Sequence, residues 1–148
     1  MTRIMPIVAE QRGANLSAGS FVTARCCLAA VFLYSGITKL AFSSAGLREF
    51  AALGIPLPAL ILSATIVVQI GAGLALAIGW RSRAAALTLA AFTGLATLVG
   101  HPFWAFEGAD FHRQLTTALE HLAIIGGLVL IASVGSGPIS LQPRKDLP

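Results

Sequence analysis

The stretch LPALILSATIVVQIGAGLALAIGW, residues 57–80, contains no charged residue. A helix needs roughly 20 mostly apolar residues to cross the hydrocarbon core of a bilayer, and this stretch reaches that length. The following stretch, residues 84–106, is also uncharged, and only Arg81-Ser82-Arg83 separates the two. The sequence therefore predicts two consecutive membrane-spanning helices joined by a short basic turn.

The composition of the whole chain agrees with a membrane protein. Of its 148 residues, 56% are hydrophobic and 11% are charged, whereas about 25% of an ordinary soluble domain is charged. The net charge is +4, but the ten lysines and arginines are scattered and form no basic stripe. Nucleic-acid binding requires such a patch, so we expect contact with a lipid bilayer and none with nucleic acid.

The first and last spans contain ionisable residues. Residues 21–42 include Arg25 and Lys39 near their ends, and the last span includes Glu120 and His121. The sequence GSGP at residues 135–138 ends the last helix, because glycine and proline terminate helices. The predicted fold is an all-α four-helix transmembrane bundle. Its domain covers residues 20–142, its tails are residues 1–19 and 143–148, and its spans are approximately residues 21–42, 57–80, 84–104 and 115–134.

The basic residues predict the orientation, because short cytoplasmic loops are enriched in lysine and arginine. With both termini inside, seven basic residues are cytoplasmic: Arg3, Arg12, Arg25, Arg81, Arg83, Arg144 and Lys145. Three are outside: Lys39, Arg48 and Arg113. We therefore expect a multi-pass protein of a bacterial cytoplasmic (inner) membrane, with both tails in the cytoplasm.

Three of the predicted spans bring ionisable residues to a similar depth near the outer boundary. These residues are Lys39, His101, Glu120 and His121. A charged glutamate facing lipid is costly, so we expect Glu120 to form an ion pair with Lys39 inside the bundle. Trp104 follows His101 closely and is the expected lid of this polar cluster.

Each of these residues also has a structural interpretation. Lys39 can extend its ammonium to the interface, and His101 can simply end a helix before Pro102. Gln69, near the middle of the second span, is expected to form an interhelical hydrogen bond. Arg25 is expected to anchor the inner end of the first helix by extending its side chain to the interface.

The residues indicate no intrinsic cofactor. Cys26 and Cys27 are the two cysteines, and they are adjacent. The chain has neither a Cys-x-x-Cys motif nor a Cys/His metal spacing, so no metal site is predicted and both thiols are expected to be reduced and replaceable. No pattern identifies a catalytic residue.

Four segments together resemble the DoxX family of small four-helix membrane proteins. They are RCCLAAVFLYSGITKL (25–40), FAALGIPLP (50–58), GHPFW (100–104) and LAIIGGLVLIASVGSGPISL (122–141). Family members resemble this chain in carrying Arg25, Ser35-Gly36, Lys39, Gly54-Ile55-Pro56, His101 and Gly126-Gly127. The chain departs from the family at Gln69, where a glutamate is frequent, and at Glu120-His121, where a Lys-Asn pair is frequent.

The resemblance implies a role in a membrane redox system, because DoxX-like proteins are associated with quinone-linked thiosulfate oxidation and with complexes that protect against oxidative or thiol stress. We expect an accessory subunit without independent catalytic activity, which contacts a quinone at the polar cluster and has a redox protein or a second copy as its partner. Two alternatives remain open: a small transporter that uses the polar cluster, and a purely structural membrane subunit.

Overall fold

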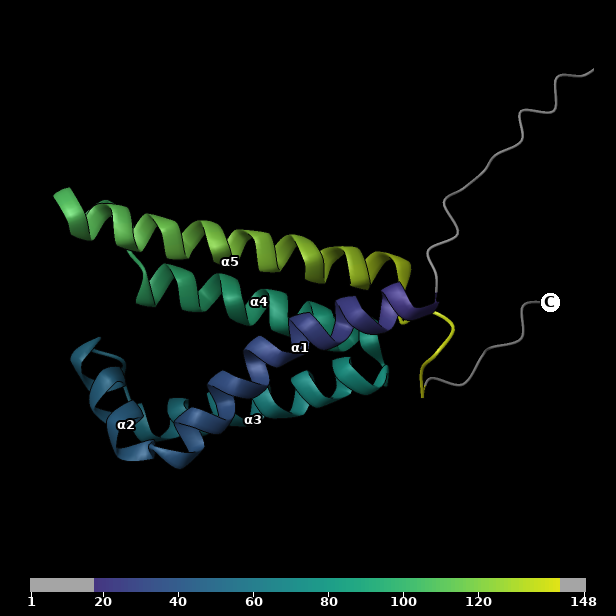
Figure 1. Cartoon of the computed structure of the whole chain (residues 1–148). Coiled ribbons are helices and arrows are strands. Elements are labelled where there is room, and N and C mark those ends of the chain that lie inside the picture. The colour runs from purple at the N-terminus through teal and green to yellow at the C-terminus, as the bar shows by residue number, and fades with distance from the viewer. Residues whose placement is uncertain (1–17, 142–148) are drawn as a thin grey trace, which may run out of the picture.

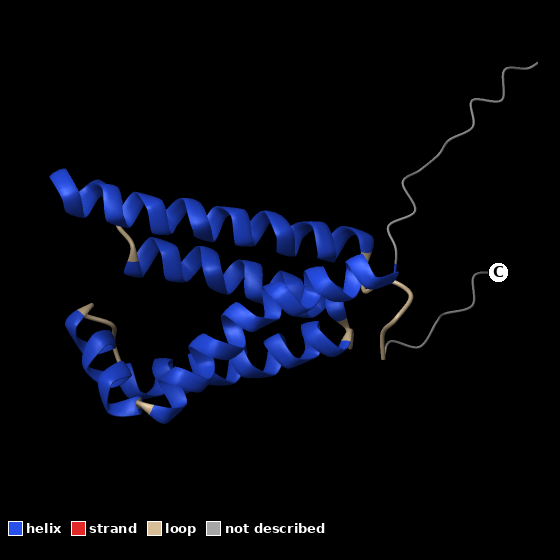
Figure 2. Ribbon diagram, viewed as in Figure 1, coloured by secondary structure: helices blue, strands red, loops and turns tan. Residues whose placement is uncertain are grey.

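The computed structural model describes residues 18–141, and within this range it contains helices and no strand (Figures 1 and 2). Four helical segments are long and apolar enough to cross a membrane, which confirms the predicted all-α four-helix fold. The tails beyond these residues lie outside the described part of the chain. The elements are α1 (Ala18–Ala41), α2 (Ser43–Ala52), α3 (Pro58–Ile78), α4 (Ser82–Gly100), the 3₁₀ helix η1 (Phe103–Ala105) and α5 (Gly108–Val134).

The long helices form two pairs. Helix α1 packs mainly on α3, and α4 packs mainly on α5; we call these pairs the α1–α3 arm and the α4–α5 arm. Figure 1 shows that the arms meet where α1 begins and α5 ends, and diverge toward α2 and the start of α5. We call the first region the closed half (residues 18–30, 71–90 and 125–141) and the second the open half (residues 31–70 and 91–124).

The packed core lies almost entirely in the closed half. Its small members on α3 and α4 let the helices approach closely, which is the main source of attraction between helices in lipid. Only Phe32, at the boundary, belongs to the open half, and Leu62 is buried there outside this cluster. The core residues are Ala29, Phe32, Ala75, Leu76, Ala85, Ala86, Leu89, Leu128 and Ile131.

The α1–α3 arm depends on a close approach at Gly36. A Cβ atom at this position would lie 2.8 Å from Cγ1 of Ile70 and 3.1 Å from Cβ of Gln69. Only a residue without a side chain leaves room for α3 there, so Gly36 sets the spacing of the two helices just below Lys39.

Arg25 lies in the closed half near the start of α1 and is 2% exposed. Its guanidinium donates hydrogen bonds to the backbone carbonyls of Ser136 and Ile139, the latter at 2.8 Å. The backbone N–H of Leu141 also donates to the carbonyl of Ile78 at 3.2 Å. The expectation that Arg25 extends to the interface is therefore wrong, because the chain folds back after α5 and covers this side chain.

Several boundaries differ from the expected spans. Residues 43–52, expected as part of a link, form α2 (Figure 1). Helix α4 ends at Gly100 because the residue before Pro102 disfavours helical geometry. Helix α5 begins at Gly108, seven residues earlier than expected, with Asp110 stabilising its first turn.

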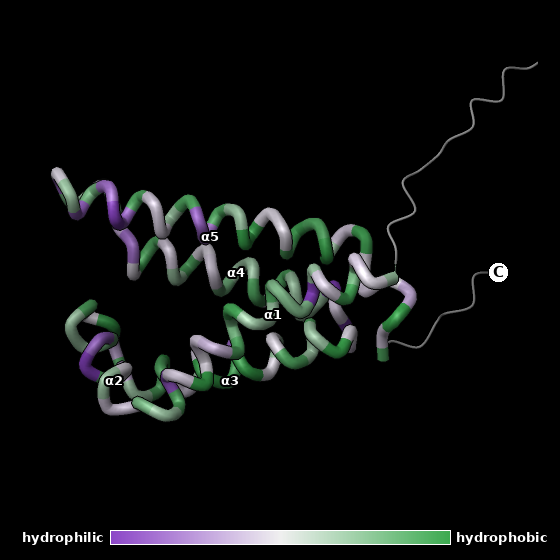
Figure 3. Tube along the Cα trace, in the orientation of Figure 1, coloured by the Kyte–Doolittle hydropathy of each residue, from purple (hydrophilic) through white to green (hydrophobic). Residues whose placement is uncertain are grey.

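The hydropathy of the surface follows this arrangement. Figure 3 shows apolar residues along most of the four long helices, with hydrophilic residues at α2 and in the first turns of α5. The 27 residues of α5 extend about 40 Å, which exceeds the roughly 30 Å of hydrocarbon in a bilayer. The first turns of α5 are therefore suited to the polar boundary of the membrane.

Candidate functional site

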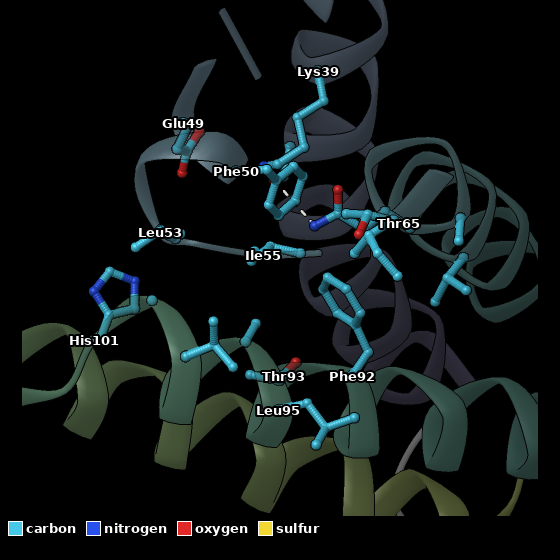
Figure 4. Close-up of a pocket in the computed structure, with 18 of the residues that line it drawn as sticks. Lys39, Glu49, Phe50, Leu53, Ile55, Thr65, Phe92, Thr93, Leu95 and His101 are labelled. Atoms are coloured by element: carbon cyan, nitrogen blue, oxygen red, sulfur yellow. Dashed lines mark hydrogen bonds between the residues drawn. The ribbon is translucent and has the colours of Figure 1, made fainter. Parts of the chain in front are cut away.

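A cavity of about 690 Å³ lies between the two arms in the open half (Figure 4). All five α-helices or the loops beside them contribute to it, and the lining is mostly apolar. Aromatic and aliphatic side chains from facing helices form its walls, among them Phe32, Ile61, Val68, Phe92 and Val99. Its size lies within the range of pockets that hold a small organic ligand.

The α1–α3 wall carries a short hydrogen-bonded chain of polar groups. Lys39 Nζ donates to Ser35 Oγ at 2.9 Å, and Gln69 Nε2 donates to the same oxygen at 3.1 Å. Ser35 and Lys39 are one turn apart on α1, so their side chains share a face. All three line the cavity, and no carboxylate lies within ion-pair distance of Lys39 among the described residues.

The α4–α5 wall carries two histidines whose rings lie 5.2 Å apart in an edge-to-face arrangement. His101 Nδ1 lies 2.7 Å from Gln114 Oε1, and His121 Nδ1 lies 2.7 Å from Thr97 Oγ1. Both histidines line the cavity. In Figure 4, Lys39 and His101 reach toward the cavity from facing sides, so polar groups stand on both of its walls.

Glu120 does not join this cluster, which corrects the expected arrangement. Its side chain is exposed on the outer side of α5 and does not line the cavity. The one ion pair among residues 18–141 joins Arg113 to Asp110 at 3.0 Å, so the expected pair between Lys39 and Glu120 is absent. Successive helical residues point about 100° apart, and it is His121 that faces inward.

Trp104 also lies outside the cavity lining. It is 60% exposed on η1 and packs edge-to-face on Phe103, with ring centroids 5.1 Å apart. The structure therefore does not place Trp104 as a lid. The Pro102 turn directs η1 along the end of the α4–α5 arm instead.

Helix α2 supplies lining residues that the sequence did not indicate. Glu49 and Phe50 line the cavity from α2, and Leu53 and Ile55 follow them. Figure 4 shows these side chains on the side opposite α4. A signal was present in residues 43–52, since alanine, leucine, arginine and glutamate favour helices, but the segment is too short to be recognised by its apolar pattern.

The cysteines lie apart from the site. Cys26 and Cys27 are free and exposed on α1, and neither lines the cavity. Within residues 18–141, no group of three histidine, cysteine, aspartate or glutamate side chains could hold a metal ion.

Comparison with known proteins identifies the family. The sequence matches the DoxX family over residues 20–102, which is more than half of the chain. It is 26% identical over 121 residues to inner membrane protein YphA of Escherichia coli (strain K12), covering 82% of this chain and 86% of that protein. It is 29% identical over 121 residues to inner membrane protein YqjF of the same organism, covering 82% of this chain and 88% of that protein.

No solved structure matches the chain. The family match, the two inner membrane relatives and the four apolar helices agree with one another. The chain is therefore an integral membrane protein that belongs to the DoxX family.

Proposed function

We propose that this protein is an accessory subunit of a membrane redox system and binds a quinone-class ring in the cavity between its arms. The observation that carries the proposal is the pairing of apolar walls with hydrogen-bonding groups on two facing sides, Lys39 on one and His101 on the other (Figure 4). A quinone ring has the same character: an apolar face with one oxygen at each end.

The apolar side chains suit the ring itself. Phe32, Phe50 and Phe92 line the cavity and offer faces and edges to an aromatic ligand, a contact that contributes about 0.5–1.5 kcal/mol beyond surface burial. The ammonium of Lys39 retains donors beyond its bond to Ser35, because a lysine carries three. It is suited to an oxygen atom at one end of the ring.

We place the protein in a bacterial inner membrane, as its relatives' names state for them, with both termini in the cytoplasm. In this orientation the open half lies toward the outer face. The basic residues Arg81 and Arg83, which join α3 to α4, then lie on the cytoplasmic side. A redox protein that uses the bound ring, or a second copy, is the partner that we propose.

The test is ligand binding to the full chain in lipid nanodiscs. We expect a short-chain benzoquinone or its reduced form to bind saturably, and Lys39→Met to weaken that binding about tenfold or more, the effect of losing a hydrogen bond from a charged donor. Ser63→Ala is the matched control, because Ser63 is exposed, bonds its own helix and lies outside the lining.

Other outcomes separate the alternatives. Failure of both ring forms to bind would reject the proposed function. Flux of a small solute through proteoliposomes, abolished by Lys39→Met, would favour the transporter. If the protein shows neither ligand binding nor solute flux, the interpretation as a structural subunit remains.

A further inference from the structure

The cavity holds an acceptor that no donor reaches. Gln69 is 5% exposed, and its Nε2 donates a hydrogen bond to Ser35 Oγ. Its Oε1 is buried without any hydrogen-bond partner. A buried acceptor left without a donor costs roughly 1–3 kcal/mol, so a group on a bound ligand that donates to Oε1 would remove this cost.

Nε2 of His121 is a second acceptor, as the positions of the protons on Thr97 and on the His121 ring indicate. Thr97 has one hydroxyl proton, and it donates that proton to the carbonyl of Thr93 at 2.7 Å. Thr97 Oγ1 can then only accept from His121 Nδ1, 2.7 Å away. Nδ1 of His121 therefore carries the proton, and Nε2 of the neutral ring is an acceptor.

His101 presents a third acceptor by the same reasoning. The oxygen Oε1 of Gln114 cannot donate, so the 2.7 Å contact requires the proton on His101 Nδ1. Nε2 of the neutral His101 ring is then an acceptor as well. The rings of His101 and His121 both line the cavity.

We infer that the cavity selects the reduced, quinol form of the ring over the quinone. This inference rests on the proposed function. A quinone carbonyl only accepts hydrogen bonds, so it leaves Gln69 Oε1 without a donor and cannot donate to the histidine nitrogens. A quinol hydroxyl can accept from Lys39 and donate to Gln69 through the same oxygen, and the second hydroxyl can donate to a histidine on the facing wall.

The experiment compares the dissociation constants of a short-chain benzoquinol and the matching benzoquinone, measured without oxygen on the full chain in nanodiscs. We expect the quinol to bind about tenfold more tightly, the effect of satisfying one buried acceptor. Gln69→Leu removes that acceptor. The ratio of the quinone dissociation constant to the quinol dissociation constant should therefore fall about tenfold, which abolishes the preference for the quinol.

Two control variants separate this role from a structural one. Gln69→Glu keeps an acceptor at the same place, so the preference for the quinol should persist. Ser35→Ala removes the partner of Gln69 Nε2 but leaves the acceptor Oε1 in place. It should therefore weaken the binding of both ligands and preserve the ratio of their dissociation constants.

The outcomes are distinguishable from failure of the proposed function. A quinone that binds as tightly as the quinol, or more tightly, overturns the inference while ring binding itself stands. An unchanged ratio in Gln69→Leu also overturns it. If neither form binds to the wild-type chain, the proposed function fails together with the inference.

Discussion

The closed and open halves of the bundle each hold a basic residue of α1, in contrasting surroundings. Arg25 in the closed half is 2% exposed, and backbone carbonyls of the segment after α5 accept its hydrogen bonds. Lys39 in the open half is partly exposed, bonds Ser35 and lines a cavity. The two cations lie 14 residues apart on one helix, yet one is surrounded by protein and the other retains donors for a ligand.

The contrast between Arg25 and Lys39 indicates that the stability of the fold and the binding of a ligand depend on different regions of the bundle. The core residues lie almost entirely in the closed half with Arg25, whereas the helices around Lys39 diverge and leave about 690 Å³ between them. Tight packing in one half allows the other half to remain hollow, because the arms are held together where they meet. We therefore expect substitutions in the closed half to act on folding, and substitutions of the polar side chains that line the cavity to act mainly on the ligand.

The largest effect on stability is expected for Arg25→Ala. It leaves the carbonyls of Ser136 and Ile139 without their donor, and each hydrogen bond to a charged group contributes about 1.5–3 kcal/mol. We expect the free energy of unfolding to fall by about 3 kcal/mol. Thermal unfolding of the purified protein in one detergent measures this.

Lys39→Met is the matched comparison on the same helix. We expect it to change the free energy of unfolding by less than about 1 kcal/mol, the usual scale for a partly exposed charge. Equal melting temperatures for the Arg25 and Lys39 variants would contradict the division between the two halves.

A smaller effect is expected for Gly36→Ala at the contact of α1 with α3. The added methyl meets Ile70 Cγ1 at 2.8 Å, and overpacking of this kind costs about 1–3 kcal/mol. Gly94→Ala is the control, because nothing lies within 4 Å of a Cβ at that position. Comparison of the two melting temperatures measures the effect, and a Gly94 variant less stable than the Gly36 variant would refute the close approach.

The smallest effect on ligand binding is expected for Glu120→Gln. Glu120 is exposed and does not line the cavity, so the dissociation constant of the ring should remain within about twofold of the wild-type value. In the double variant with Lys39→Met, the two effects should add, as they do for residues without a shared partner. If the two effects do not add, Lys39 and Glu120 interact, and the protein then has a second conformation in which they form the expected ion pair.

The sequence alone predicted the four apolar helices, because the uncharged runs around residues 57–80 and 84–106 allow hardly any other fold. It also predicted that Lys39, His101 and His121 lie near one end, and all three line the cavity of the open half. It failed for Glu120 because a residue of α5 changes from the inner to the outer face with a rotation of 100°, and helix rotation depends on packing with α4. It failed for Arg25 because the fold-back of residues 135–141 leaves no periodic pattern.

The most direct test of ring binding between the arms is photocrosslinking with an azido-benzoquinone, followed by mass spectrometry of the labelled peptides. The ring is expected to contact both walls of the open half, so label should appear on the peptide that contains Lys39 and on the peptide that contains His101, and excess unlabelled ligand should abolish both. Label confined to exposed residues of one arm, or label that excess ligand does not displace, would contradict this account.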